Sequence, residues 1–344
     1  MKKLKVLFLL ASSNFSGAEN VVCTIIENIR NDIECFYCCP NGNIREQLEE
    51  RKIKYIPLKR LSYFELKKYI KKYKPDIIHA HDYRASFLAT LFCKKCKIIS
   101  HIHVNNPTMT KRNIKSYMYR VLARRYKKII WVSDSALDNY YYKKNILNKS
   151  IVLYNVINSK EIERKANIDK CRKNYDLIFI GRLSEQKDPE RLIEIIRLLK
   201  EKKENIKLAI LGEGEKRLLI EDKIFKSSLQ DNIDLYGFIN NPFPILKNSK
   251  LLIITSRWEG TPMVAIEAQA LNKPIISTPV DGMKKIIKND FNGFISDNNN
   301  EIAYKILQYL DDSQYEILAR NVKNNFVYIN NSDEYFKKLK KIYI

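Results

Sequence analysis

Long apolar runs are missing from this 344-residue sequence, which contains no stretch of the roughly 18–20 consecutive apolar residues that a membrane-spanning helix requires. The apolar start, residues 6–11, is shorter than the roughly 7–15-residue core of a signal peptide, so we interpret it as a first buried strand. The seven cysteines are an odd number and argue against a disulfide framework, so reduced and mostly buried thiols are expected. These absences predict a cytoplasmic protein that at most touches a membrane surface.

Acidic residues are absent between Asp82 and Asp134, a stretch that holds 12 Lys or Arg residues. Residues 1–160 contain 31 Lys and Arg against 12 Asp and Glu, a net charge of +19 out of +23 for the whole chain. A field of this sign attracts phosphate, whether in nucleic acid, anionic lipid or a pyrophosphate-linked substrate. Residues 106–125 place apolar side chains at helical spacing among basic ones, which suits a helix on an anionic membrane or, equally, a solvated helix with a core-facing stripe.

Signatures of metal binding are also scarce, because no Asp-x-Asp triad occurs anywhere in the chain. The four histidines form two His-x-His pairs, His79 with His81 and His101 with His103, each at the end of a predicted strand. Residues i and i+2 of a strand share a face, so a metal site is geometrically possible. The alternative is that these side chains are polar plugs satisfied by backbone groups. We expect no metal and no cofactor.

Apolar runs of strand length alternate with helical patterns along almost the whole chain, beginning with residues 5–10 and a helix over residues 18–29. This rhythm predicts doubly wound parallel sheets, whose ligands bind outside the carboxyl ends of the strands. The length suits two domains. We expect an N-terminal domain over residues 1–160, a polar linker over 161–174, a C-terminal domain over 175–325 and a final helical segment over 326–344.

The predicted C-terminal domain contains a strand–loop–helix unit suited to phosphate. An apolar run ends at Ile254, a polar turn follows over residues 256–260, and Pro262 stands where a helix would begin. The N–H groups of the helix N-terminus would face a ligand beyond the strand end. Glu259 lies in the loop, and Glu267 lies on the otherwise apolar helix, where a carboxylate needs a partner such as a hydroxyl-rich ligand. The alternative is that Glu267 reaches solvent and Glu259 is an ordinary loop acid.

A second unit of this kind runs from Gly181 to Pro189 and carries two cations. Arg182 follows a predicted strand, and Lys187 precedes the predicted start of a helix. An arginine can fork onto a diphosphate, and a lysine can supply a point charge. The alternative is that these are two independent solvated charges.

The sequence E-G-T-P-M-V-A-I-E from Glu259 to Glu267 resembles the E-x7-E element of the retaining GT-B glycosyltransferases. The likeness is greatest to the large bacterial family, group 1 or family 4, that builds surface polysaccharides and lipid-linked glycans. The run G-R-L-x-x-x-K from Gly181 to Lys187 matches the diphosphate-binding pair of that family. Together the two motifs form a specific double signature.

A weaker match lies near the start of the chain, where G-A-E at residues 17–19 resembles the G-G-A-E element of the family with Ser16 in place of its first glycine. The likeness extends over nearly the whole chain. It implies an α/β protein of the GT-B fold, with two doubly wound Rossmann-like domains facing a cleft. It also implies that the final helix packs back on the N-terminal domain.

The resemblance assigns a role to each charged motif residue. Arg182 and Lys187 would stabilise the leaving nucleoside diphosphate in place of a metal ion, as preorganised charges do. Glu267 would hold the ribose hydroxyls, and Glu259 would orient the donor sugar. These roles make the reaction metal-independent.

A histidine at a strand end would contact the sugar hydroxyls, and His103 matches this position best, with His101 as the fallback. The loops after two further strands would line the nucleotide, with Phe238 and Ile239 beside the base. The catalytic set implied is Glu259, His103, Arg182 and Lys187. The donor-binding set implied is Gly17, Arg182, Lys187, Gly212, Phe238, Ile239, Gly260, Thr261, Met263, Val264 and Glu267.

The function implied is transfer of a sugar from a nucleotide sugar, expected to be UDP-linked, to a hydroxyl of a growing surface glycan such as capsule or lipopolysaccharide, with retention of configuration. The acceptor is expected to be lipid-linked, which would bring a cytoplasmic enzyme to the inner face of the membrane; no nucleic-acid partner is expected. Two alternatives stay open. One is a catalytically silent basic scaffold that binds RNA or anionic membrane. The other is a sugar-phosphate synthase or nucleotide-sugar hydrolase on the same fold.

Overall fold

The computed structural model of the chain describes residues 3–93, 95–103, 106–168 and 173–344. It divides into two compact units, which we call unit 1 (residues 1–156 and 331–344) and unit 2 (residues 157–330). Each unit has its own sheet and its own buried apolar core. Among the described residues, no helix combines the length and the apolar character needed to cross a lipid bilayer.

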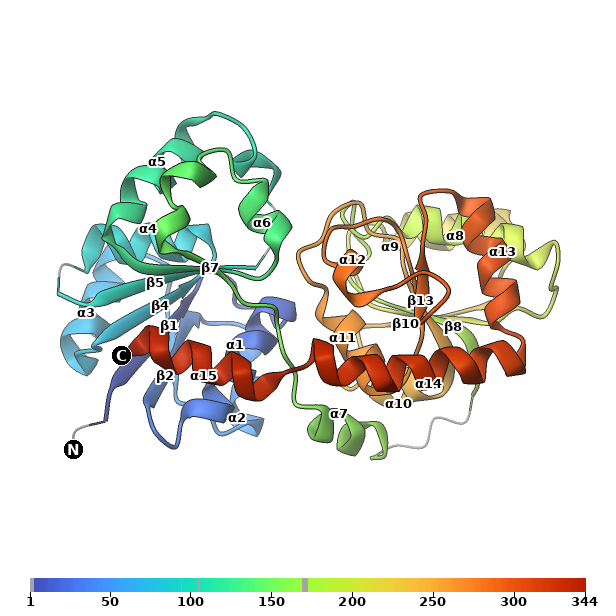
Figure 1. The fold of residues 1–344 in the computed structure, drawn as a ribbon, viewed down its shortest axis with the longest axis horizontal. Coiled ribbons are helices and arrows are strands. Elements are labelled where there is room, and N and C mark those ends of the chain that lie inside the picture. The colour runs from blue at the N-terminus through green and yellow to red at the C-terminus, as the bar shows by residue number, and fades with distance from the viewer. Residues whose placement is uncertain (1–2, 94, 104–105, 169–172) are drawn as a thin grey trace. The chain divides into compact units, whose positions relative to one another are not determined.

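Unit 1 is built on a seven-stranded parallel sheet in the order β3-β2-β1-β4-β5-β6-β7. Apolar residues fill both faces of β1 because helices cover the sheet on both sides, with α1 and α15 below it and α4 and α5 above it in Figure 1. Its strands are β1 (Lys5–Leu10), β2 (Glu34–Pro40), β3 (Tyr55–Leu58), β4 (Ile77–His81), β5 (Lys97–Ile102), β6 (Tyr126–Trp131) and β7 (Ser150–Val152). Its helices are α1 (Gly17–Ile29), α2 (Ile44–Glu50), α3 (Tyr63–Tyr73), α4 (Tyr83–Phe92), α5 (Ile114–Leu122), α6 (Asp134–Asp138) and α15 (Ser332–Tyr343).

Unit 2 is built on a six-stranded parallel sheet in the order β10-β9-β8-β11-β12-β13. The prediction of two doubly wound parallel sheets is therefore confirmed. Its strands are β8 (Tyr175–Ile180), β9 (Leu208–Leu211), β10 (Ile233–Gly237), β11 (Ser249–Ile254), β12 (Ile275–Ser277) and β13 (Gly293–Ile295). Its helices are α7 (Ser159–Ala166), α8 (Pro189–Lys200), α9 (Arg217–Lys226), α10 (Phe243–Lys247), α11 (Met263–Ala270), α12 (Met283–Ile286), α13 (Asn299–Tyr309) and α14 (Asp312–Ile329).

The strand order reverses once in each sheet, between β1 and β4 in unit 1 and between β8 and β11 in unit 2. At such a switch point the connections that follow two neighbouring strands leave toward opposite faces, and ligands bind outside the strand ends between them. The loops after β8 and β11 carry the two strongest sequence motifs. The topology alone therefore brings these motifs to one edge of the unit 2 sheet.

The chain passes between the units at residues 156–157 and again at residues 330–331. The N–H of Ile157 donates to Asn330 Oδ1 (2.8 Å), and Asn330 Nδ2 donates to the carbonyl oxygen of Ile157 (3.1 Å), so the two passages are held together. Residues 161–166, expected to be linker, instead belong to α7, which Asn158 caps by accepting a hydrogen bond from the N–H of Glu161. Residues 169–172 of the expected linker lie outside the described residues.

Helix α15 belongs to unit 1, where it closes one face of the sheet. Its Lys340 pairs with Asp32 (2.5 Å), and its buried Tyr343 hydroxyl lies 2.8 Å from Nδ1 of His79 in β4. The last helix is thus tied to the centre of the first sheet by a polar contact at its buried end.

The cysteines differ in part from the expectation of reduced thiols, since Cys93 and Cys96 form a disulfide in the α4–β5 connection. Their Cα atoms are 5.8 Å apart, a separation that a disulfide spans without backbone movement. The other described cysteines are free and buried, and burial raises the pKa of the Cys23 and Cys35 thiols to about 12. These thiols stay protonated and unreactive at neutral pH.

Candidate active site

The loops after β8 and β11 meet through a buried ion pair between Lys187 and Glu259. The Lys187 ammonium contacts Glu259 Oε1, and the Ser256 hydroxyl donates to the same oxygen (2.8 Å). The side chains of Lys187 and Glu259 are only 19% and 9% exposed. Two charges removed from water are tolerated only when each has a close partner of opposite charge or a hydrogen bond. Here Lys187 comes from the first motif and Glu259 from the second.

Further hydrogen bonds join the two loops into one rigid body. The N–H of Arg257 donates to the carbonyl oxygen of Gln186 (2.8 Å), and Gln186 Nε2 donates to the carbonyl oxygen of Trp258 (3.0 Å). The Thr255 hydroxyl donates to the carbonyl oxygen of Lys187 (2.9 Å). The positions of Lys187 and Glu259 are therefore fixed by backbone as well as by their own contact.

Arg182, the other predicted cation, lies exposed at the end of β8, and its guanidinium forms no hydrogen bond or ion pair with any residue that the structure describes. The neighbouring cations are already neutralised. Lys216 pairs with Glu185 and Glu190 (both 2.7 Å), and Arg257 pairs with Asp188 (3.0 Å). Arg182 thus keeps its full charge available for an anion.

The predicted helix after β11 is α11, and its N-terminal loop is buried. Gly260 and Thr261 are buried, Met263 is 7% exposed, and Val264 is half-buried. Glu267 is also half-buried, on a helix whose other side chains are mostly buried, so neither the fully buried nor the fully solvated expectation describes it. The N-terminus of α11 points its N–H groups toward the same edge of the sheet as Lys187.

Glycines allow the loops at this edge to pack closely. Gly212 was predicted to belong to the site, and Gly282 was not. Gly212 has φ +144°, and a Cβ on it would overlap the carbonyl oxygen of Gly181, directly before Arg182. A Cβ on Gly282 would overlap the carbonyl oxygen of Gly260. Gly282 therefore lets the loop after β12 lie against the N-terminal loop of α11, a contact that no local sequence pattern signals.

Phe238 and Ile239, the residues expected beside the base, directly follow β10. Phe238 is 65% exposed and Ile239 is half-buried. An exposed aromatic ring at a strand end can stack on a flat ligand without losing a core contact. Their strand β10 is separated from β8 by β9 alone.

Two predicted site residues, Gly17 and His103, belong to unit 1. Gly17 is exposed and begins α1, after a loop in which the Ser16 hydroxyl donates to the buried Glu19 carboxylate. Sequence reasoning missed Asp82, which follows β4, accepts from the N–H groups of Ala11 (3.2 Å) and Ala85 (2.8 Å), and so joins the ends of β1 and β4. Burial raises the pKa of Asp82 to about 6. The signal for Asp82 was its place as an N-cap directly before α4.

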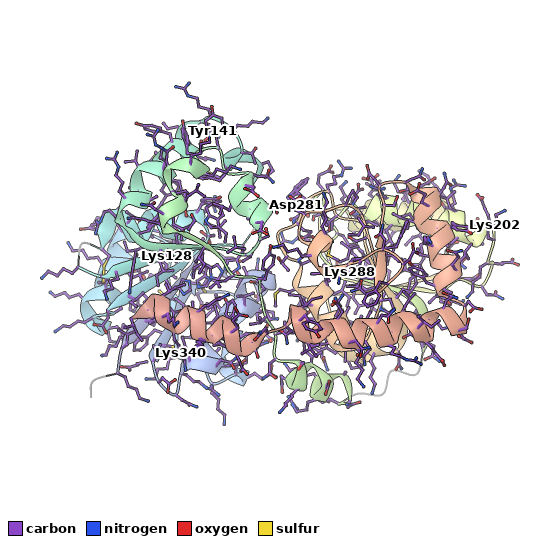
Figure 2. All side chains as sticks on the ribbon, in the orientation of Figure 1. Lys128, Tyr141, Lys202, Asp281, Lys288 and Lys340 are labelled. Atoms are coloured by element: carbon purple, nitrogen blue, oxygen red, sulfur yellow. A yellow bond between two sulfur atoms is a disulfide. The ribbon has the colours of Figure 1, made fainter. Side chains whose placement is uncertain are left out.

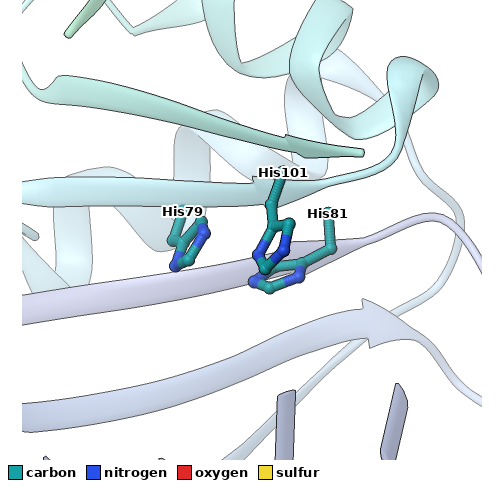
Figure 3. Close-up of side chains that lie close together, drawn as sticks. All are labelled: His79, His81 and His101. Atoms are coloured by element: carbon teal, nitrogen blue, oxygen red, sulfur yellow. The ribbon is translucent and has the colours of Figure 1, made fainter. Parts of the chain in front are cut away.

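The four histidines gather at the carboxyl ends of β4 and β5, and Figure 3 shows three of them side by side. His79, His81 and His101 are fully buried, whereas His103 is partly exposed at the end of β5. Nδ1 of His81 lies 2.8 Å from Nε2 of His103. Of the two histidines considered for the sugar, only His103 has exposed surface, but its Nδ1 is buried and has no hydrogen-bond partner among the described residues. Burial lowers the pKa of His103 to about 3, so its ring is neutral.

Helix α5 presents an apolar surface to solvent instead of to the core. Asn113 caps it in a reciprocal hydrogen-bonded box with Ser116. Tyr117 and Val121 are 50% and 42% exposed, while the buried side is formed by Ser116 and Tyr119. Leu122 packs partly against the core, so the core-facing alternative holds for that residue and not for Tyr117, Met118 and Val121. An open groove of about 620 Å³ lies beside it, lined by Arg112, Asn113, Ile114, Tyr117, Arg120, Tyr141 and Tyr142.

Two family models together match almost the whole chain. The model described as Glycosyltransferase Family 4 matches residues 15–161, and the model described as Glycosyl transferases group 1 matches residues 159–326. An uncharacterized glycosyltransferase of Methanocaldococcus jannaschii, MJ1059, is 30% identical over 288 residues, which are 77% of this chain and 68% of that protein. The chain belongs to the family 4, group 1 glycosyltransferases. The resemblance drawn from the motifs is confirmed.

Other comparisons extend over the full length of this glycosyltransferase. A Campylobacter jejuni relative, named as a GalNAc-alpha-(1->4)-GalNAc-alpha-(1->3)-diNAcBac-PP-undecaprenol alpha-1,4-N-acetyl-D-galactosaminyltransferase, is 26% identical over 93% of each chain. The crystal structure of Anabaena Alr3699/HepE in complex with UDP-glucose superposes with a TM-score of 0.84 at 18% identity over 98% of each chain. These likenesses confirm the GT-B fold class.

Proposed function

We propose that this glycosyltransferase moves a sugar from a UDP-sugar to a hydroxyl of a growing lipid-linked surface glycan, with retention of anomeric configuration and without a metal ion. The observation that carries the proposal is the switch-point site of unit 2, where Lys187 and Glu259 are paired and Arg182 is free among the described residues. The HepE structure named with UDP-glucose supports the choice of donor. The relative named with PP-undecaprenol supports a lipid-linked acceptor.

The reaction breaks the bond between the anomeric carbon and the diphosphate oxygen, so negative charge grows on the leaving diphosphate. Arg182 and Lys187 stabilise that charge, and the N–H groups of Thr261, Met263 and Val264 add to it at the start of α11. Preorganised donors of this kind cost no reorganisation during the step. The acceptor oxygen forms the new bond on the same face of the sugar, and its proton passes to the departing phosphate oxygen.

The Lys187–Glu259 pair gives both residues a defined position before the donor arrives. When the donor binds, the Lys187 ammonium contacts the diphosphate as well as the Glu259 carboxylate. The second carboxylate oxygen of Glu259 accepts a hydrogen bond from a sugar hydroxyl. Glu267 accepts from the ribose hydroxyls, and Phe238 with Ile239 lies against the base. The roles of Gly17 in donor binding and of His103 at the sugar, both residues of unit 1, are proposed from the family motifs alone.

The exposed face of α5 supports a contact with an anionic membrane that carries the acceptor. Basic residues surround its apolar side chains, and Figure 2 shows Tyr141 on the outer surface of the same part of unit 1. Apolar side chains insert at the boundary between headgroups and acyl chains, and basic ones bind the phosphates. This surface supports a location on the inner face of the cytoplasmic membrane.

The test is a screen of nucleotide sugars for release of nucleoside diphosphate in the presence of lipid-linked acceptors, followed by variants with the selected donor. Lys187→Ala should lower kcat by roughly 100-fold or more, as expected when a charge stabilising the leaving group is lost. Glu267→Ala should weaken donor binding about tenfold, as expected when a charged hydrogen bond is lost, while the far-UV spectrum stays unchanged. The exposed Lys202, labelled in Figure 2, is the matched control, and Lys202→Ala should change neither value.

Unchanged donor affinity in Glu267→Ala would refute its ribose role. A protein that releases no nucleoside diphosphate from any donor, yet binds RNA or anionic vesicles with strong salt dependence, would instead be the basic scaffold considered above. Release of nucleoside diphosphate that does not depend on any glycan acceptor would indicate a hydrolase.

A further inference from the structure

A cluster of nitrogen ligands lies inside unit 1, includes His101 and contacts His103, the residue proposed to meet the sugar. His79 and His81 come from β4 and His101 from β5, and His81 pairs with His101 in the register of the two strands. One ring nitrogen from each of the three lies within 4.8 Å of the other two. All three side chains are fully buried (Figure 3).

The hydrogen bonds around this cluster leave several ring nitrogens without partners. A neutral imidazole has one N–H donor and one acceptor nitrogen. His79 uses Nδ1 with the Tyr343 hydroxyl, and His81 uses Nδ1 with Nε2 of His103 (both 2.8 Å). Nε2 of His79, Nε2 of His81 and both nitrogens of His101 have no hydrogen-bond partner among the residues that the structure describes. Buried polar atoms are normally satisfied, so this concentration indicates a missing ligand.

We propose that His79, His81 and His101 bind one divalent transition-metal ion of the zinc class. Imidazole nitrogen suits zinc, copper and nickel, and three such ligands leave a fourth position for water. Zinc–nitrogen bonds of about 2.0–2.1 Å in a tetrahedron bring the ligand atoms about 3.4 Å apart, so the rings close on the ion by small rotations about their side-chain bonds.

The outer contacts of the cluster are those that a metal site needs. A metal-bound histidine generally donates the N–H of its second ring nitrogen to a neighbouring acceptor, and this hydrogen bond fixes the orientation and the tautomer of the ring. The Tyr343 hydroxyl takes this place for His79, and Nε2 of His103 takes it for His81. With Nδ1 protonated in both rings, the lone pair of each Nε2 is left for the ion.

The ion would be structural, and it would take no part in the departure of the diphosphate. Through His79 and Tyr343 it stabilises the docking of α15 on the sheet, and through His81 it orients His103 at the end of β5. It would therefore raise the stability of unit 1. The proposal stands on unit 1 alone, and the binding of zinc can be measured without any transfer reaction.

The experiment uses the full-length protein without a histidine tag, stripped with a chelator and dialysed. Calorimetric titration with Zn²⁺ should give one site per chain, and metal analysis after a second dialysis should find about one zinc per chain. Zinc should also raise the thermal midpoint. His101→Asn, with an unchanged far-UV spectrum, should bind Zn²⁺ at least tenfold more weakly. The double variant Cys93→Ser/Cys96→Ser removes the other close pair of metal-type ligands and should bind as the wild type does.

The outcomes are separable even when the histidine variant fails to fold. Co²⁺ added to the stripped wild type should give the visible absorption of a tetrahedral nitrogen site, and crystals should show anomalous zinc scattering between the three rings. No bound zinc in the wild type, an ordinary water at that position, or equal binding by folded His101→Asn would overturn the proposal. Binding that is lost in the cysteine variant would overturn it as well.

Discussion

Lys187 and Glu259 are 72 positions apart in the chain, and their contact with Ser256 makes them one structural group. Buried ion pairs add little net stability, because the cost of removing charges from water offsets the attraction. Their value here is geometric, since the pair holds a cation and a carboxylate ready at the edge of the sheet. Removing either partner alone would leave a buried charge unpaired and would alter both stability and catalysis.

Lys273, just before β12, is a residue whose charge costs stability. Burial, assisted by the nearby charge of Lys247, lowers the pKa of its ammonium to about 8. Its Nζ lies 3.3 Å from the Tyr315 hydroxyl, and the structure shows no carboxylate partner for it among the described residues. Below pH 8 the ammonium is charged in both the folded and the unfolded protein, so the full cost of its burial is present.

We predict that the free energy of unfolding rises between pH 7.5 and 9.5 by about 1–2 kcal/mol on account of Lys273. In this range the folded protein releases the proton while the unfolded chain keeps it, so the unfolded state binds more protons and stability increases with pH. Lys273→Met should remove this increase and should stabilise the protein at pH 7.5. Urea unfolding followed by circular dichroism at both pH values measures the effect.

The matched control is Lys250→Met, which removes a more exposed lysine that lies over the same Tyr315 ring. It should leave the rise of stability with pH in place. A Lys273→Met protein whose stability rises with pH as steeply as that of the wild type would show that another group is responsible.

At the residue scale, the sequence drew attention to Lys187 and Glu259 but did not predict that they touch. Lys187 and Glu259 were assigned separate tasks because local patterns carry no information on contacts between distant loops. Gly282 and Asp82 were missed for the same reason, since one fits against Gly260 and the other joins β1 to β4. The roles of His103 and Glu267 remain predictions.

Helix α5 is an element that exposes apolar side chains such as Tyr117 and Val121, while Tyr119 on its other side is buried in the core. Its basic neighbours are not all alike. Arg125 donates to the carbonyl oxygens of Thr90 (3.0 Å) and Cys93 (2.7 Å), so it supports the end of α4 and is not available to a lipid phosphate. The exposed cations of this surface lie before α5, in it and directly after it.

We predict that neutralising four exposed basic residues of this surface releases the protein from vesicles that contain phosphatidylglycerol. Each cation near an anionic surface contributes about 1 kcal/mol, so the loss should approach about 4 kcal/mol of binding free energy. Co-sedimentation with vesicles at low and moderate salt measures it. The changed residues are Lys111, Arg112, Lys115 and Arg124.

The control removes the same amount of charge from α3 in the same unit and should retain most of the binding. Vesicle binding that persists in the α5 variant, or that is lost equally in both, would show that α5 is not the contact. The control residues are Lys67, Lys68, Lys71 and Lys72, all exposed.

At the element scale, strands were the most predictable parts, because parallel sheets covered on both faces demand continuous apolar runs. The error was α7, which is mostly charged and of which residues 161–166 were taken for linker. Only Ile162 and Ala166 are buried in it, too few to produce a recognisable apolar period. The disulfide between Cys93 and Cys96 was also missed, since an odd cysteine count says nothing about two neighbours in one turn.

At the scale of the whole molecule, unit 2 is an insertion between β7 and α15 of unit 1. All of its core residues lie within residues 157–330, and those of the cluster in unit 1 lie within residues 7–146. A segment with its own core and adjacent ends is expected to fold independently. The alternation of strands and helices predicted the two sheets. That the last segment packs on the first domain was expected only from the family resemblance, with a start at residue 326, and the structure returns to unit 1 at residue 331.

We therefore predict that residues 157–330, expressed alone, unfold in one cooperative transition and bind UDP. The Lys187–Glu259 pair, Arg182 and α11 are all contained in this fragment, and Trp258 beside Glu259 gives a fluorescence signal for both measurements. Lys187→Ala in the same fragment should weaken UDP binding and, because it leaves the buried Glu259 carboxylate without its partner, should also lower the unfolding midpoint. A fragment that stays unfolded, or that binds UDP equally with and without Lys187, would contradict the prediction.

The clasp between Asn330 and Ile157 has a consequence for how such enzymes diversify. The first and last residues of the inserted segment are hydrogen-bonded to each other. Recombination that exchanges the whole segment therefore has to preserve only this one contact, between the side chain of an asparagine and a backbone amide. Lineages that keep this junction could trade one donor preference for another in a single genetic step, while unit 1 is inherited unchanged.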